Sequence, residues 1–197
     1  MSETCITGLV LGILSYFQIK DERLGQIISY IINNQMKDGG WNCRYIRGAT
    51  HGSFHTTLMV LEALHEYKQS FSSNEFEIYV MQEKAHEFLL NHRLYKSHRT
   101  GNIVDSNMTL LTFPPRWKYK VLSALDYFQA VNHPYDERFS DAIEIILKKE
   151  KNGKWPLQQA ISGKIWFKME ESRQPSRWNT LKSLRVLNWW KRQLKQS

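Results

Sequence analysis

The apolar residues of this chain recur with the period of an α-helix along most of its length. The clearest stripe follows Asp21 and occupies positions i, i+3, i+4, i+7 and i+8, filled by Leu24, Ile27, Ile28, Ile31 and Ile32. Asp21 is a favourable N-cap residue, and Glu22 suits the positive first turn of a helix. We see no strong strand pattern, so we expect an all-α protein.

The same helix pattern occurs a second time. Asp136-Glu137-Arg138 repeats the opening Asp21-Glu22-Arg23. The apolar residues that follow it in the same register are Phe139, Ala142, Ile143, Ile146 and Leu147. The preceding segments also match, since 14–18 reads LSYFQ and 125–129 reads LDYFQ. This agreement indicates an internal duplication.

A second kind of helix alternates with the first. Its copies at 10–14, 60–64 and 121–125 read VLGIL, VLEAL and VLSAL, and a fourth lies within 181–190. Repeats of roughly 55 to 60 residues that cannot bury their apolar faces alone must stack on their neighbours. We therefore predict one domain over 1–197, with repeats at about 1–50, 51–114 and 115–174 and a final helix in 175–197.

The turns after the first kind of helix carry the most specific motif. Residues 30–41 read Tyr-Ile-x3-Gln-x3-Gly-x-Trp, with Gln35, Gly39 and Trp41 at its key positions. The back half recurs as Gly153 and Trp155, preceded by Lys149 in place of the glutamine, and the front half recurs in 84–93. A glycine there ends the helix, and the indole covers the end of the hairpin.

This motif resembles the QW repeat of squalene and oxidosqualene cyclases, and the resemblance covers nearly the whole chain. It implies the α/α toroid of terpenoid cyclases and protein prenyltransferases, in which inner helices ring a cavity and outer helices surround them. A closed ring has about six hairpins, whereas the repeats supply about three and a half. We therefore expect a toroid-like arc, an incomplete (α/α)6 barrel.

The resemblance also implies a function. In the first reading the chain is prenyltransferase- or cyclase-like and binds an isoprenoid or another large apolar ligand. In the second it is a non-catalytic helical-repeat interaction module that completes its core with another chain. An open arc exposes apolar terminal helices, so we expect self-association or a missing portion of protein to close the toroid. The Asp-rich acid motif of the cyclases is absent, which leaves open whether the chain is an enzyme.

Zinc is a possible cofactor by the same resemblance. In prenyltransferase β subunits an Asp-x-Cys pair and a histidine near the starts of inner helices hold the metal. Glu3, Cys5 and His55 stand at matching places here, with Cys5 and His55 each six residues before an equivalent leucine. Thiolate, imidazole and carboxylate are ligands that zinc accepts. The alternative is that Cys5 is a small buried residue and His55 a polar residue at a helix start. Cys43 and His51 are conceivable substitute ligands.

The chain has a formal net charge of +8, and this charge suggests a binding site only where basic residues lie near the predicted start of a helix. Arg116 falls in the same register as Cys5 and His55, and His98 and Arg99 lie in a basic loop. These three residues are candidates for binding an anionic head group beside a helix N-terminus. The alternative is that they brace turns. We find no specific nucleic-acid signal, and acidic residues such as Asp38, Asp105 and Asp126 show no spacing that identifies a catalytic pair.

Two segments of the sequence bear on the cellular location of the protein. The apolar run 6–19 follows acidic rather than basic residues, so we expect a buried core helix there and no signal peptide. The last helix, Asn179–Gln193, is basic and amphipathic, which allows peripheral membrane contact, although its match to the other inner helices favours an inner-helix role. With two cysteines in all, we expect reduced thiols and a cytoplasmic chain.

Overall fold

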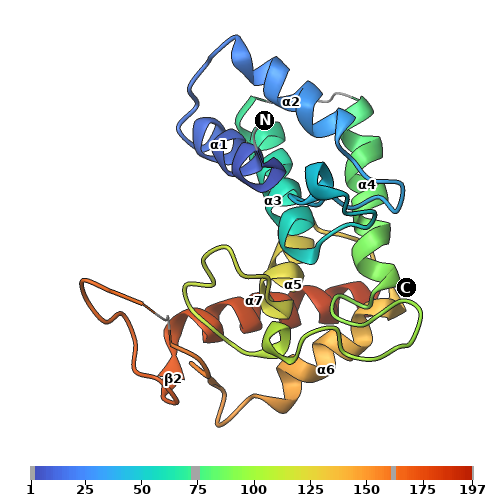
Figure 1. Ribbon diagram of the computed structural model, residues 1–197. Helices are drawn as coiled ribbons and strands as arrows, with labels where there is room; N and C mark the ends of the chain where they lie inside the picture. Colours follow the sequence, from blue (N-terminus) through green and yellow to red (C-terminus); the bar gives the residue numbers. More distant parts are fainter. Residues whose placement is uncertain (1–2, 72–75, 161–162, 197) are drawn as a thin grey trace. The chain divides into compact units, whose positions relative to one another are not determined.

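The structure is a computed structural model that describes residues 3–71, 76–160 and 163–196 (Figure 1). The described residues form seven α-helices, short 3₁₀ turns and one two-stranded sheet, as expected for an all-α protein. They divide into two compact units, Met1–Leu90 and Asn91–Ser197. The arrangement of the helices as a toroid-like arc within one domain stays a prediction.

The first unit contains α1 (Thr4–Tyr16), α2 (Arg23–Asn33), α3 (Phe54–Phe71) and α4 (Phe76–Asn91), the last of which ends one residue beyond it. α1 packs along α3 (Figure 1). A Cβ added at Gly8 would lie 3.3 Å from Val60 Cγ2, and one added at Gly12 would lie 3.6 Å from Ala63 Cα. The absence of a side chain at Gly8 therefore lets the two helices approach closely there, whereas a Cβ at Gly12 would make an ordinary contact.

This packing corrects the expectation of a buried core helix over 6–19. The helix forms, but its apolar residues face solvent: the exposed fractions are 49% for Ile6, 47% for Leu9 and 48% for Ile13. The buried face instead carries small or polar residues together with Leu11. Composition could not reveal this, because the glycines, rather than the more hydrophobic side chains, determine which face meets α3.

The second unit contains α5 (Val121–Ala130), α6 (Ser140–Lys148) and α7 (Arg177–Leu194), with antiparallel strands β1 (Trp155–Pro156) and β2 (Pro175–Ser176). α5 packs along α7. The core is aromatic: Phe139 meets Phe128 at a ring-centroid distance of 4.8 Å and Trp189 at 5.3 Å. Trp189 is fully buried, and the inner-helix role of the last helix stays a prediction.

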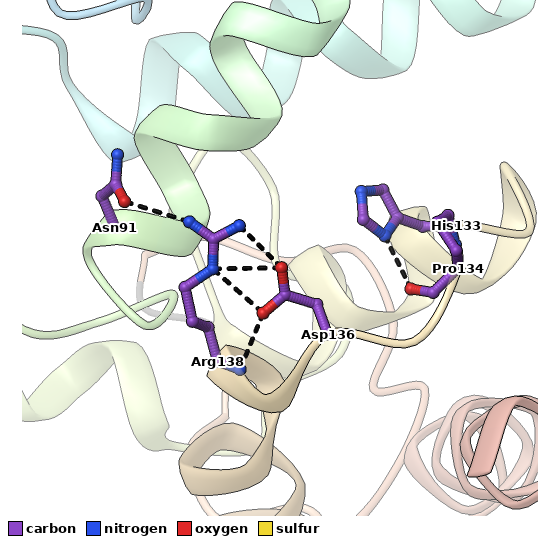
Figure 2. Close-up of polar contacts among 5 residues, drawn as sticks. All are labelled: Asn91, His133, Pro134, Asp136 and Arg138. Carbon is purple, nitrogen blue, oxygen red and sulfur yellow. Dashed lines mark hydrogen bonds and ion pairs between the residues drawn. The ribbon is translucent and has the colours of Figure 1, made fainter. Parts of the chain in front are cut away.

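The predicted duplication is visible where α2 and α6 begin. Asp21 accepts a hydrogen bond from the backbone N–H of Arg23 at 2.8 Å, and the side chains of the two residues form an ion pair at 2.7 Å. Asp136 and Arg138 repeat both interactions at 2.8 and 2.6 Å (Figure 2). Arg138 also donates to Asn91 at 3.0 Å. Asp21 therefore stands one residue before the N-cap of α2, Glu22, and Asp136 caps the 3₁₀ turn Glu137–Phe139 that leads into α6.

The two turns that contain Trp41 and Trp155, here called the tryptophan turns, make the same hydrogen bonds. The Trp41 indole donates to the carbonyl of Ile31 at 2.9 Å, and the Trp155 indole donates to that of Ile146 at 2.6 Å. The backbone N–H of Trp41 donates to Thr57 Oγ1 at 2.9 Å, and that of Trp155 donates to Thr180 Oγ1 at 3.0 Å. Each indole therefore caps the end of the helix before it, α2 or α6, and each turn is tied to the helix that follows.

None of the helices in 3–71, 76–160 and 163–196 is both long and apolar enough to cross a bilayer.

Candidate functional site

A cavity of about 200 Å³ lies in the second unit, beside the segment that leads into α5. Its walls carry the side chains of Arg116, Lys118 and Lys120, together with Trp117 and Gln159. Among the described residues that line it, none is acidic. The cavity therefore has the charge expected of an anion-binding site.

The backbone before α5 fixes this arrangement. Arg116 has a left-handed conformation with φ of 51°, which turns the chain after Pro115. Tyr119 is buried, and its hydroxyl donates to the carbonyl of Leu94 at 2.7 Å. Burial raises the pKa of Tyr119 well above its ordinary value, so the hydroxyl remains a donor. This anchor holds the neighbouring lysines in place.

Two lysine amines lie in a common polar environment. Lys120, only 3% exposed, donates from Nζ to the carbonyl of Asn107 at 2.7 Å and to Gln159 Oε1 at 3.3 Å. Burial lowers the pKa of Lys120, and the charge of Lys118 lowers it further. In the described part of the chain, the hydrogen-bond acceptors of this amine are neutral.

Lys149 is the second amine. Its Nζ donates to the carbonyl of Thr109 at 2.5 Å and to Gln158 Oε1 at 2.6 Å. Burial lowers the pKa of Lys149 to about 8, and the nearby charge of Lys120 contributes to the shift. The two lysines thus concentrate positive charge that an anionic ligand would balance.

A second cavity, of about 240 Å³, adjoins the first and has a more apolar wall. Phe113, Leu157, Trp166 and Phe167 line it, and Arg116 belongs to the walls of both cavities. The exposed fractions of Trp166 and Phe167 are 89% and 73%. Large aromatic side chains this exposed offer binding surface to an apolar ligand.

The predicted anion-binding residues are only partly brought together. Arg116 lies at the junction of the two cavities. His98 and Arg99 are exposed in the turn after α4, and the described walls of the cavities include neither. The His98 ring instead lies 6.1 Å from that of His92. Sequence reasoning did not select Lys118, Lys120 or Lys149, although the Lys-Tyr-Lys run at 118–120 was a usable signal.

The predicted zinc ligands are also partly brought together. Possible ligand atoms of Glu3, Cys5 and Cys43 lie within 4.8 Å of one another, so Cys43 joins this group and His55 does not belong to it. Cys5 and Cys43 lie at disulfide distance from each other, and the expectation of reduced thiols stays a prediction. Because zinc binds thiolates, the disulfide form of this group does not fit the metal.

Two of the acidic residues considered as catalytic candidates, Asp38 and Asp105, accept hydrogen bonds from backbone N–H groups. Asp38 accepts hydrogen bonds from the backbone N–H groups of Gly52 at 2.7 Å and Gly40 at 3.2 Å. Asp105 caps a 3₁₀ turn through a bond from the N–H of Asn107 at 2.8 Å. These interactions give both carboxylates a structural role.

Comparisons of the chain with protein-family models, with curated proteins and with solved structures found no match.

Proposed function

We propose that this chain binds a large apolar ligand with an anionic head group, of which an isoprenoid diphosphate is an example. The head group would lie in the cationic cavity, and the apolar part would follow the aromatic cavity. The observation that carries the proposal is the position of Arg116 in the walls of both. A ligand of this kind needs one charged and one apolar subsite, joined by a residue that can contact both parts.

The charge distribution favours such a ligand. Arginine offers a planar fork of donors suited to phosphate or carboxylate oxygens, and lysine adds point charge. Lys120 also directly precedes α5, whose first backbone N–H groups favour negative charge. An anion in the cavity would offset the burial of the Lys120 amine and raise its pKa toward its ordinary value.

We also propose that the helices form a toroid-like arc, which the resemblance of the tryptophan turns to the QW repeat favours. The capping of an outer helix by Trp41 and Trp155 is the physical role that the motif needs. The proposal concerns binding, because the chain lacks the acid motif that would start a cyclisation.

Zinc enters the proposal for the reduced chain. A cytoplasmic location, which we also propose, would keep Cys5 and Cys43 as thiols. The two sulfurs and Glu3 would then offer two thiolates and a carboxylate, which are ligand types that zinc accepts. Reduced protein made without a His-tag should contain zinc, and Cys43→Ser should lower its content. Metal content near zero in both proteins would contradict this part of the proposal.

Fluorescence titration with farnesyl diphosphate tests the main proposal, with farnesol and inorganic diphosphate as partial ligands. Arg116→Glu should weaken binding of the whole ligand at least about tenfold, equivalent to about 1.4 kcal/mol. Arg99→Glu makes the same charge change outside the described cavity walls and should leave binding unchanged. Equal binding by both variants would contradict the proposed site.

The exposed apolar face of α1 favours the second candidate function, an interaction module that completes its core with another chain. Ile6, Leu9 and Ile13 are each close to half exposed on a helix that sequence analysis assigned to the core. Analytical ultracentrifugation of the chain over a range of concentrations tests this function. A constant monomer mass would argue against self-association as the way in which the face is covered.

A further inference from the structure

The groove between α1 and α3 is apolar along its floor. A cavity of about 290 Å³ lies there, lined from α1 by residues that include Leu9, Ile13 and Phe17 and from α3 by Met59 and Ala63. Leu9 and Ile13 are 47% and 48% exposed, and Phe17 is 67% exposed. A continuous apolar strip of this kind is characteristic of a surface that another helix covers.

One border of this groove is acidic. Glu62 and Glu66 stand one turn apart on α3 and line the same cavity. The described residues of the groove wall include no lysine or arginine. A helix that docks here should therefore combine exposed leucines with basic residues.

α7 has such a face on its solvent side. Leu181 and Leu184 are 50% and 51% exposed. Exposed Lys191 and Lys195 continue the same stripe at helical spacing, and Arg177 precedes it by one turn. The stripe is separate from the buried face of the helix, which carries Val186 and Trp189. Its centre is apolar and its two ends are basic.

We propose that the solvent face of α7 of one copy docks in the α1–α3 groove of a second copy. α1 packs on α3 in the first unit, and α5 packs on α7 in the second. α1 and α7 are the first and the last of these four helices in the sequence, and each leaves one apolar face exposed. Docking of α7 of one copy against α1 and α3 of a second copy would cover both faces.

Charge complementarity selects this pairing over a symmetric one. Two α1–α3 grooves placed face to face would bring Glu62 and Glu66 of both copies together, and two α7 faces would bring lysines together. The pairing of α7 with the groove joins opposite charges. Such a contact is heterologous, so two copies close into a ring when each supplies one groove and one α7, or otherwise extend into longer assemblies. The inference does not depend on ligand binding.

Sedimentation velocity of the whole chain from about 1 to about 100 µM tests the proposal, because mass action makes such an assembly concentration-dependent. We expect the mass to rise above that of a monomer. Glu62→Lys/Glu66→Lys should weaken association at least about tenfold, and so should Lys191→Glu/Lys195→Glu. Glu77→Lys/Glu87→Lys on α4 makes a matched charge change away from the groove and should have no effect. Circular dichroism checks that each variant is folded.

Mixing the two interface variants gives the sharpest result. The lysine-bearing groove of one variant complements the glutamate-bearing α7 of the other, so the mixture should associate where each variant alone does not. A monomeric wild-type chain throughout the range would overturn the proposal, and so would association that neither reversal weakens. Co-flotation of a monomeric wild-type chain with anionic vesicles would also overturn it, by assigning these faces to a lipid surface.

Discussion

Lys149 occupies in the second tryptophan turn the position that Gln35 occupies in the first. Gln35 Nε2 donates to the carbonyls of Gly39 and Met81 at 2.8 and 2.9 Å. Lys149 Nζ donates to the carbonyl of Thr109 and to Gln158 Oε1. The two side chains therefore both tie a helix end to a neighbouring segment, but only the lysine brings a charge into a half-buried position.

Replacing this lysine with the glutamine of the other turn should stabilise the second unit. The pKa of Lys149 is lowered from 10.5 to about 8 in the folded chain, so the unfolded chain binds more protons between these pH values. The wild-type free energy of unfolding should therefore rise as pH increases from about 8 to 10.5, and this gain should be absent below pH 8. Lys149→Gln should be the more stable protein at pH 7, and its advantage should shrink across that window.

Urea unfolding of both proteins at several pH values measures this difference. Lys148→Gln is the matched control, because it removes the same charge from a side chain that is 70% exposed and paired with Glu144 on the surface. An advantage of Lys149→Gln that does not depend on pH would show that its charge is not responsible.

The Cys5–Cys43 disulfide should stabilise the first unit. It joins positions 38 residues apart, for which loop closure in the unfolded chain predicts about 4 kcal/mol. Cys5→Ser and Cys43→Ser should each lower the melting temperature of oxidised protein by a similar amount. In excess reductant the wild-type chain should lose most of this advantage. A wild-type melting temperature that reductant leaves unchanged would contradict the contribution of the bond.

The indole cap of α6 should also be measurable. Trp155→Phe removes the donor to the carbonyl of Ile146, while most of the apolar ring surface remains, so we expect a loss of about 1 to 2 kcal/mol. Trp166→Phe changes an exposed ring and should alter stability by less than about 0.5 kcal/mol. Chemical unfolding compares the two, and equal stabilities would argue against a capping role for Trp155.

The glycine packing of α1 predicts opposite results at two helical glycines. Gly8→Leu places a large side chain against Val60 and should cost about 1 to 3 kcal/mol through overpacking. Gly25 in α2 has nothing within 4 Å of an added Cβ, so Gly25→Leu should stabilise the chain by about 0.5 to 1 kcal/mol through helix propensity. Thermal unfolding checks both signs. A stabilising Gly8→Leu would show that α1 and α3 do not pack closely at this glycine.

Sequence periodicity predicted the helices and their entries well, because those features depend on local spacing. Asp21 and Asp136 each accept a hydrogen bond from a backbone N–H at a helix entry, as their residue type indicated, and the stripe containing Ile28 and Ile31 is buried. The tryptophan turns were equally readable, since the distance from an indole to the carbonyl it caps is set within ten residues.

The candidate site was less accessible to sequence reasoning, because its residues meet through loops. Arg116 was found from its register with the starts of other inner helices. Lys149 was identified only as a replacement for glutamine, since nothing local shows that Thr109 and Gln158 receive its amine. The proximity of Cys43 to Cys5 was likewise not predicted, because it arises from the turn that brings the chain back to α1, 38 residues further along.

Because the backbone at Arg116 is left-handed, the residue that would be best for folding stability at this position differs from the one that would be best for ligand binding. A residue with a side chain costs about 1 kcal/mol in this conformation, whereas glycine adopts it freely. Arg116→Gly should therefore raise the melting temperature while removing the guanidinium from both cavities. A screen that selects variants only for a high melting temperature would therefore select against Arg116. The more stable variant would lack the positive charge at the junction of the two cavities.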